Sequence, residues 1–406
     1  MNPMILLPDT LYILRDKTNQ VVTTNVEEYS IYYKNILYPF DSNYDIKIDC
    51  DFGMNLDRCW RITDFSNCKK TFPLTLSVYL FGELLVKKSI TIEIVERNNQ
   101  ELSLLCIGDS MTQAEEYEMQ AVIKAEKIKT LGTRCSKLVH HEGRGGLKLY
   151  SYRHIYTHAG WFTSPFLFPE NIPGELYYGD ESMWESVQNE PNRYTSVGFT
   201  YKPIQDGMYT LRDGKLYLYK NDSYELVYEA PVFTFDFEKY MLRNQIETPD
   251  VVSFLFAAND LQVTPYEQTA DEINTMLTYQ EEMLENIQKY VKNIIICLPV
   301  CGADQYCWGT RMGCKGTVKQ YEYNMKHYAK ALLEKYDNRQ SEGIYICPMS
   351  AVCDPDAGFN TDSSPANIYS VLPVHHQTNW VHPNVAGYKQ MGDALAGVLC
   401  KVKNTL

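Results

Sequence analysis

The pattern of apolar and polar positions divides the chain into two parts near residue 97. Up to that point the segments YDIKIDC, LTLSVYLF and LLVKKSITIEIV alternate or run apolar, and Gly82-Glu83 is a turn signal between the last two. No helical periodicity competes with this pattern. We predict a small all-β sandwich over residues 1–97, with the polar stretch ERNNQE as a linker.

From residue 98 to 406, short apolar runs alternate with stretches of helical periodicity. Continuous apolar runs are typical of parallel strands that are covered on both faces. We therefore predict a doubly wound, flavodoxin-like α/β sheet. Its strands are LSLLCIG, SKLVHHEG, DVVSFLFAAND, NIIICLPV and GIYICPMS, and its helices are residues 111–131, 264–291, 317–336 and a last helix capped by Asn384. Thr264 with Glu267, or Thr269 with Glu272, is a candidate capping box for the second helix.

An insertion of about 100 residues, roughly 150–248, interrupts this alternation after the second strand. Its centre, MYTLRDGKLYLYKNDSYELVY, is predicted to be a hairpin turning at Asp213-Gly214. The insertion is rich in tyrosine and contains Trp161 and Trp184. Such aromatic surfaces bind sugars in some proteins, but an insertion that packs on itself explains the composition equally well.

Charge and cysteine content exclude several classes. A formal net charge of −13 argues against nucleic acid as a partner. No apolar run is long enough to span a membrane, and the first residues lack the features of a secretory signal, which predicts a cytoplasmic protein without a membrane partner. The twelve cysteines include a C-x3-C-x5-C-x6-C series that is not a usual zinc spacing, so reduced thiols are expected, with disulfides or a metal site as alternatives. No metal or cofactor is predicted, and the oligomeric state is left open.

Four polar segments stand where predicted strands end or where the last helix begins. Each has an ordinary explanation by itself: a helix cap, a glycine turn, an Asx turn and a structural histidine. Because the carboxyl ends of parallel strands meet at one edge of a sheet, we expect them to lie together, and they are the parts that acyl transfer needs. These residues are Ser110, the glycines Gly143, Gly145 and Gly146, Asn259 and His382.

The order of these segments resembles that of the SGNH, or GDSL-type, hydrolases over roughly residues 102–400. Gly108-Asp109-Ser110 matches the first block of that family, and the resemblance implies that Ser110 is the nucleophile and one oxyanion donor. Gly146, with Gly145 as second choice, corresponds to the glycine donor of the second block. The third block, G-x-N-D, reads Ala257-Ala258-Asn259-Asp260 here, so the amide donor Asn259 is retained while the leading glycine is replaced.

The last block of the family, D-x-x-H, reads Asn379-Trp380-Val381-His382 in this chain. An aspartate at this place holds the histidine ring in the correct tautomer and stabilises its protonated form. Three readings stay open. His382 forms a dyad with Ser110 and is oriented by Asn379 or by a backbone carbonyl, or a carboxylate is supplied instead by Glu142, Asp354 or Asp356, or the site is impaired. The resemblance implies a serine esterase that removes a small acyl group, most simply acetyl, from a carbohydrate-type substrate. The alternatives are a carbohydrate-binding or structural protein on an impaired scaffold, and a lipase or thioesterase.

Overall fold

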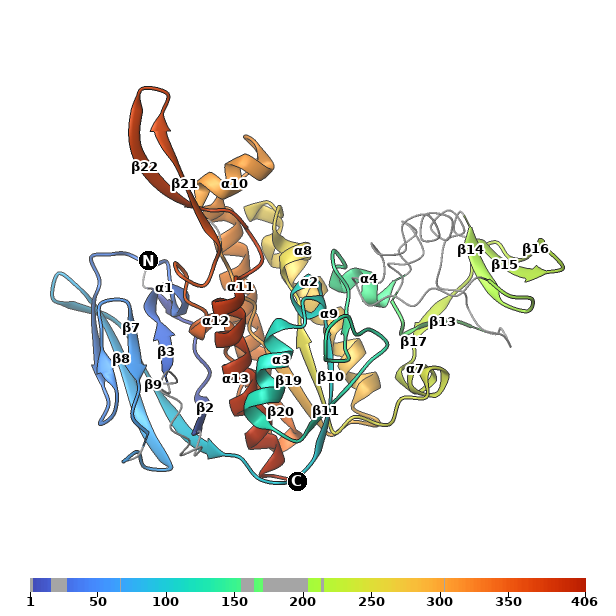
Figure 1. Cartoon of the computed structure of the whole chain (residues 1–406), viewed down its shortest axis with the longest axis horizontal. Helices are drawn as coiled ribbons and strands as arrows, with labels where there is room; N and C mark the ends of the chain where they lie inside the picture. The colour runs from blue at the N-terminus through green and yellow to red at the C-terminus, as the bar shows by residue number, and fades with distance from the viewer. Residues whose placement is uncertain are drawn as a thin grey trace.

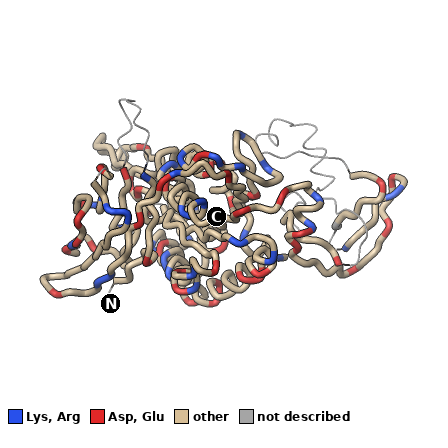
Figure 2. Tube along the Cα trace, turned by 90° about the horizontal axis from the view of Figure 1, so that it is seen from below, with Lys and Arg blue, Asp and Glu red and all other residues tan. Residues whose placement is uncertain are grey.

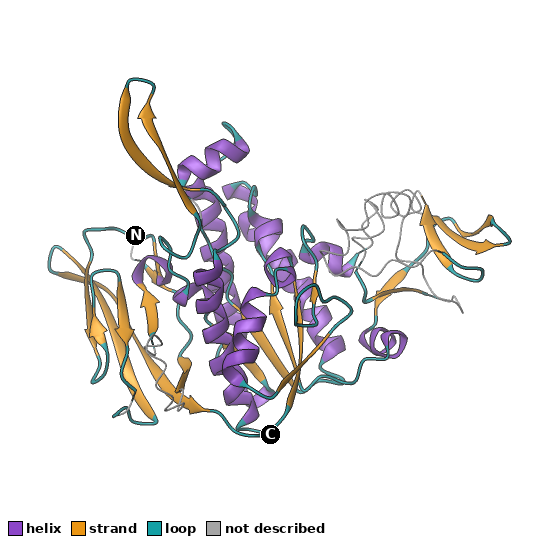
Figure 3. Ribbon diagram, in the orientation of Figure 1, coloured by secondary structure: helices purple, strands orange, loops and turns teal. Residues whose placement is uncertain are grey.

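The computed structural model describes residues 3–15, 28–65, 67–154, 164–170, 204–212, 215–302 and 304–406. A β-rich N-terminal part lies beside a larger part in which helices flank a sheet (Figure 1; Figure 3). Lys and Arg are interspersed with Asp and Glu along the described trace (Figure 2). None of the helices in the described ranges is long and apolar enough to cross a membrane.

The N-terminal part consists of small β-sheets, as the alternating pattern predicts, and its strand pairs are antiparallel except for the parallel pair β2 and β9. The largest sheet has the order β2-β9-β8-β5, and a smaller one has the order β3-β7-β6. The elements are β1 (Met4–Ile5), β2 (Thr10–Arg15), β3 (Tyr29–Tyr32), α1 (Tyr33–Ile36), β4 (Leu37–Tyr38), β5 (Asp45–Asp49), β6 (Met54–Asn55), β7 (Cys59–Ile62), β8 (Thr71–Leu80) and β9 (Glu83–Glu96).

This part is packed onto the last helix, α13 (Val385–Lys403), and is not a loosely tethered domain. One continuous apolar core joins residues such as Leu74 and Ile92 to Leu395 and Leu399 of the helix. A Cβ atom on Gly397 would lie 2.2 Å from the carbonyl oxygen of Tyr12, so the helix approaches β2 closely because it has no side chain there.

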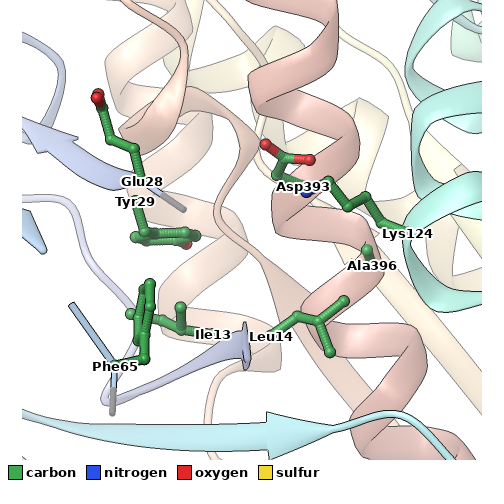
Figure 4. A pocket seen from close by; sticks show the side chains of 8 residues that line it. All are labelled: Ile13, Leu14, Glu28, Tyr29, Phe65, Lys124, Asp393 and Ala396. Carbon is green, nitrogen blue, oxygen red and sulfur yellow. The ribbon is translucent and has the colours of Figure 1, made fainter. Parts of the chain in front are cut away.

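A cavity of about 40 Å³ remains between the two parts (Figure 4). The ring of Tyr29 and the side chain of Phe65 line it from the β-rich part, and Asp393 and Lys124 line it from the helices. The residues that line this cavity include none of the four segments predicted to form a site.

The larger part contains the predicted parallel sheet, in the order β11-β10-β18-β19-β20. Side chains alternate between its two faces. Leu104 and Cys106 join the core shared with α3 and α13, whereas Leu105 and Ile107 join a second core with α9 and α11. The elements are β10 (Leu102–Gly108), α3 (Glu116–Ala125), β11 (Ile128–Leu131), β18 (Val251–Leu255), α9 (Thr269–Ile287), β19 (Asn293–Cys297), α11 (Val318–Tyr336) and β20 (Ile344–Cys347). The doubly wound α/β prediction is confirmed.

Three local predictions in this part are wrong. The helix predicted over 111–131 ends at Ala125, because Glu126 and Lys127 adopt positive φ angles of 53° and 50°, and the chain continues as the edge strand β11. The strand predicted over 136–143 is reduced to β12 (Glu142–Gly143). Residues before it bind a carboxylate instead: the backbone N–H groups of Ser136, Lys137, Leu138 and Val139 all donate to Glu115.

The third wrong prediction concerns the start of α9. The helix begins at Thr269 and follows a short 3₁₀ turn, and neither threonine caps it. The hydroxyl of Thr264 donates to the carbonyl of Asp260, and that of Thr269 donates to Asn324 and Pro265. Both side chains therefore satisfy other acceptors, and no capping box forms.

The described part of the insertion is a small β structure. The strands β14 (Tyr209–Arg212), β15 (Lys215–Lys220) and β16 (Ser223–Tyr228) form an antiparallel meander, while β13 (Leu167–Pro169) pairs with β17 (Phe233–Phe235). The helices α4 (Leu149–Arg153) and α7 (Phe237–Asn244) flank it. Trp161, Trp184 and the predicted turn at Asp213-Gly214 lie outside the described residues.

A second hairpin, which the sequence pattern did not predict, projects from the molecule shortly before His382 (Figure 1). It consists of β21 (Thr361–Asn367) and β22 (Ser370–Gln377), and it contacts α10 (Gln305–Met312). At its base the N–H of Thr378 donates to the carbonyl of Asn360 (2.9 Å), which closes the hairpin. All twelve cysteines are free thiols in this structure, as expected.

Candidate active site

Ser110 stands at the turn between β10 and the short helix α2 (Ser110–Gln113). A Cβ atom on Gly108 would lie 2.1 Å from the hydroxyl of Thr112 and 2.7 Å from the carbonyl of Leu255, so only glycine allows this turn. The cap of α2 is Asp109, whose carboxylate accepts the N–H of Met111 at 2.9 Å. Ser110 is therefore not the helix cap, and its hydroxyl is available for another partner.

That partner is His382. The hydroxyl oxygen of Ser110 lies 2.6 Å from Nε2 of His382, although the two residues are 272 positions apart in the sequence. The histidine precedes α13, whose cap is Asn384 as predicted: its side-chain oxygen accepts the N–H of Gly387 at 3.0 Å. Burial lowers the pKa of His382 below its ordinary value, which favours the neutral ring that can accept a proton.

The glycine segment after β12 lies directly beside Ser110. A Cβ atom on Gly143 would come within 2.3 Å of the backbone nitrogen of Gln113, and one on Gly145 would be 3.6 Å from Cβ of Ser110. The N–H of Gly145 donates to the side-chain oxygen of Gln113 at 2.6 Å. Gly146 has a φ angle of +78° and is exposed. Within the described ranges no acceptor takes the N–H of Gly146, which makes it a better candidate donor than Gly145.

Asn259 joins the same group of residues from the third strand. It lies in α8 (Ala258–Leu261), directly after β18, and its side-chain nitrogen donates to the carbonyl of Leu147 at 2.9 Å, which leaves its second N–H for another acceptor. The neighbouring Asp260 is buried and accepts the N–H of Leu149 at 3.0 Å. Burial raises the pKa of Asp260 to about 8. The third block is thus hydrogen-bonded to the backbone of Leu147 and Leu149, directly after the glycine segment.

Asn379 binds backbone, not the histidine ring. Its side-chain oxygen accepts the N–H groups of Val381 (3.0 Å) and His382 (2.9 Å) and so forms the turn that carries the histidine. Among the residues that the structure describes, none hydrogen-bonds to Nδ1 of His382. Asn379 therefore fixes where the histidine backbone lies and leaves the far side of the ring without a partner.

The three carboxylates considered as replacements have other partners. Glu142 is buried and is paired with Arg144 at 2.8 Å, and it also accepts the hydroxyl of Tyr240. Asp354 and Asp356 both bind Arg58. No carboxylate of the described residues completes a Ser–His–Asp arrangement here, so the reading in which another carboxylate reaches the ring is not supported by the geometry.

The acidic residue directly before the serine is Asp109. Asp109 is buried and only one of its oxygens has a hydrogen-bond partner. Burial raises the pKa of Asp109 to about 7. Sequence reasoning assigned no role to Asp109, Asp260 or Gln113. The first two lie inside the motifs that drew attention to the site, whereas nothing in the local sequence marks Gln113.

Residues 231–395 match the family model described as GDSL-like Lipase/Acylhydrolase. This span contains the segments of Asn259 and His382 and lies downstream of Ser110. No curated protein matches the chain.

Several solved structures are similar in fold. One is a carbohydrate esterase family 3 protein from Talaromyces cellulolyticus, with 12% identity over 75% of this chain and 99% of that chain and a TM-score of 0.33. Another is the acetyl xylan esterase AlAXEase, with 11% identity over 72% and 97% of the two chains and a TM-score of 0.32. A third is Axe2, an acetylxylan esterase from Geobacillus stearothermophilus, with 12% identity over 72% and 91% and a TM-score of 0.29.

The family match and the site agree with one another. The matched residues include β18, whose Leu255 pairs with Gly108 of β10, and the segment that carries His382, whose ring contacts Ser110. The chain therefore carries a GDSL-like lipase/acylhydrolase domain match over residues 231–395.

Proposed function

We propose that this protein is a serine esterase that removes a small acyl group, most simply acetyl, from a carbohydrate-type substrate through an acyl-enzyme intermediate. The observation that carries the proposal is the 2.6 Å contact between the Ser110 hydroxyl and Nε2 of His382. A nucleophile and a base within hydrogen-bond distance are the minimum that covalent acyl transfer requires.

In the proposed mechanism the hydroxyl oxygen of Ser110 attacks the ester carbonyl while Nε2 of His382 takes its proton. The resulting oxyanion accepts hydrogen bonds from the N–H groups of Ser110 and Gly146 and from the free amide hydrogen of Asn259. The tetrahedral intermediate collapses, and His382 returns the proton to the departing alcohol. A water molecule then repeats the sequence on the acyl-serine and releases the acid. The reaction needs no metal or organic cofactor.

The carbohydrate part of the proposal is supported by aromatic residues that lie close in the sequence to His382 and to the glycine segment. Trp380 stands two residues before His382 and is half-buried, with its ring 5.4 Å from that of Trp308. Tyr150, four residues after Gly146, has 46% of its surface exposed. Aromatic rings offer flat apolar faces to the C–H surfaces of a sugar ring, as Tyr and Trp do at many binding surfaces.

A second candidate function follows from Asn379. Because Nδ1 of His382 has no hydrogen-bond partner among the described residues, the imidazolium formed in the first step lacks the stabilisation that an aspartate supplies. A protein of this kind could retain a pocket for an acylated carbohydrate and bind it with little turnover. A lipase or thioesterase remains a third candidate, distinguished by the length of the acyl chain it prefers.

The test is hydrolysis of p-nitrophenyl acetate, butyrate and octanoate, and of an acetylated xylo-oligosaccharide, by the wild type, Ser110→Ala and Ser223→Ala. Ser223 is the exposed first residue of β16, so its loss is a matched control. We expect acetate release that vanishes in Ser110→Ala, persists in Ser223→Ala and falls with acyl length. Wild-type rates equal to those of Ser110→Ala on every ester would refute the esterase and favour the binding protein. A preference for octanoate would favour a lipase.

A further inference from the structure

The glycine segment next to Ser110 contains two successive N–H groups, of Gly145 and Gly146, and only one can be directed at an oxyanion. The structure distinguishes them by their partners. The N–H of Gly145 donates to the side-chain oxygen of Gln113 at 2.6 Å, whereas no described acceptor takes the N–H of Gly146. Gln113, three positions after the serine, therefore distinguishes the two N–H groups, because it accepts that of Gly145 and not that of Gly146.

Gln113 is itself held in place. It is half-buried at the end of α2, and its side-chain oxygen also lies 3.5 Å from Nη1 of Arg134. Arg134 is only 4% exposed, and the same Nη1 donates to the carbonyl of Gly143 at 3.1 Å. One buried guanidinium thus contacts both Gln113 and the first glycine of the segment, and the amide cannot rotate away without leaving buried donors unpaired.

Steric contacts also hold the glycine segment close to α2. A Cβ atom on Gly145 would meet the Gln113 side-chain oxygen at 2.9 Å, and one on Gly143 would meet the backbone of Thr112 and Gln113 at 2.5 Å or less. The segment therefore lies flat against α2, with the Gln113 amide as its polar contact. Gly146, at φ +78°, follows this contact and turns the chain away.

We infer that Gln113 is a positioning residue of the oxyanion site: by accepting the N–H of Gly145 it holds the glycine segment so that the N–H of Gly146 is left to bind the oxyanion. This inference rests on the proposed esterase function. Gln113 does not touch the reacting atoms and acts through Gly145 and Gly146. It predicts that removal of the side-chain acceptor weakens binding of the transition state more than binding of the substrate.

The experiment compares Gln113→Met, Gln113→Glu and the control Gln288→Met with the wild type. Methionine has nearly the length of glutamine but no strong acceptor, and glutamate keeps an acceptor that can also pair with Arg134. Gln288 is exposed at the end of α9, so its replacement controls for the loss of an amide elsewhere. Active sites are first counted by titration with a p-nitrophenyl phosphonate, so that rates refer to folded enzyme only.

Loss of one oxyanion donor lowers turnover by about 100- to 1,000-fold in other hydrolases, and a donor that is displaced but present should cost less. We expect Gln113→Met to lower kcat for p-nitrophenyl acetate by about 10- to 100-fold with KM changed less than threefold. Methylboronic acid forms a tetrahedral adduct with the serine, so its inhibition constant should rise in proportion to the fall in kcat/KM. Gln113→Glu should restore much of both.

Two results would overturn the inference while leaving the esterase intact. One is an active wild type whose Gln113→Met variant, normalised to titrated sites, retains its kcat. The other is a loss of activity in which the affinity for methylboronic acid is unchanged, since that pattern indicates damage unrelated to the oxyanion site. If the wild type itself neither hydrolyses the acetate nor reacts with the phosphonate, the proposed function fails, and the role of Gln113 fails with it.

Discussion

Replacement of Asn379 by aspartate would restore the carboxylate that stands at this place in the last block of the family. The side-chain oxygen of Asn379 already accepts the N–H groups of Val381 and His382, at 3.0 and 2.9 Å. A carboxylate can keep both hydrogen bonds with one oxygen and offer its second oxygen to the unpartnered Nδ1 of His382. The turn is therefore expected to survive the change, with a negative charge added beside the ring.

The expected magnitude follows from this geometry. Two unit charges about 5 Å apart attract by roughly 3 kcal/mol at an effective dielectric constant of about 20, which corresponds to about two units in the pKa of His382. His382 is half-buried, so part of this attraction is screened by solvent. Loss of the aspartate in serine proteases lowers turnover by about 10⁴, which sets an upper limit. We expect kcat/KM at pH 8 to rise by about 10- to 100-fold in Asn379→Asp.

The assay is the pH dependence of kcat/KM for p-nitrophenyl acetate between pH 5 and 9. The inflection that reports His382 should move to higher pH in the variant, because a neighbouring negative charge favours the protonated ring. Asn384→Asp is the matched control, since it adds the same charge at the cap of α13, five residues farther along the chain. A change of less than twofold in Asn379→Asp with an unmoved inflection would refute the reasoning, as would an equal gain in Asn384→Asp.

Three further outcomes are expected. In the wild type, kcat/KM should rise with pH through one inflection below 6.5, because burial lowers the pKa of His382 and only the neutral ring accepts a proton; an inflection above 7 would contradict this. Asp109→Asn should raise the free energy of unfolding by an amount that grows from pH 4 to pH 7, to about 4 kcal/mol at most. Burial raises the pKa of Asp109 from 3.8 to about 7, so the folded wild type loses stability as the pH rises through that window, whereas the asparagine variant does not. Urea unfolding at pH 4, 5.5 and 8 measures the difference, and a difference that does not depend on pH would count against it. Ala257→Gly should stabilise the protein by about 0.5–1 kcal/mol and change the activity less than twofold, because φ at Ala257 is +156° where the family has glycine. A loss of more than 1 kcal/mol of stability in thermal unfolding would show that the alanine is not strained.

The sheet could be predicted from the sequence where its strands are buried on both faces. β10, β18, β19 and β20 are continuous apolar runs, and every residue in them is buried. β11 is an edge strand with only Leu131 fully buried, so its four residues do not differ visibly from the end of a helix. The helix before it ends at Ala125, and the next two residues, Glu126 and Lys127, have positive φ angles although neither is a glycine.

Some residues of the site could likewise be predicted from the sequence, and others could not. Ser110, Asn259 and His382 could be predicted to converge because each directly follows a strand or precedes a helix in a recognisable motif. The role of Gln113 could not, since it depends on how closely the glycine segment approaches α2 in space. The sequence also does not show what the Asn379 side chain binds, because the backbone and the ring of His382 belong to a residue only three positions away.

The hairpin β21–β22 has a consequence for how this loop can vary. The N–H of Thr378 donates to the carbonyl of Asn360, and the N–H of Asn384 donates to the carbonyl of Gly358. These two hydrogen bonds hold the backbone before and after His382 without involving the hairpin strands. Most side chains of the two strands face solvent. The length of the hairpin therefore does not affect the position of the histidine. A related chain could have a short turn, a longer hairpin or an inserted domain at this point and keep the same distance between His382 and Ser110.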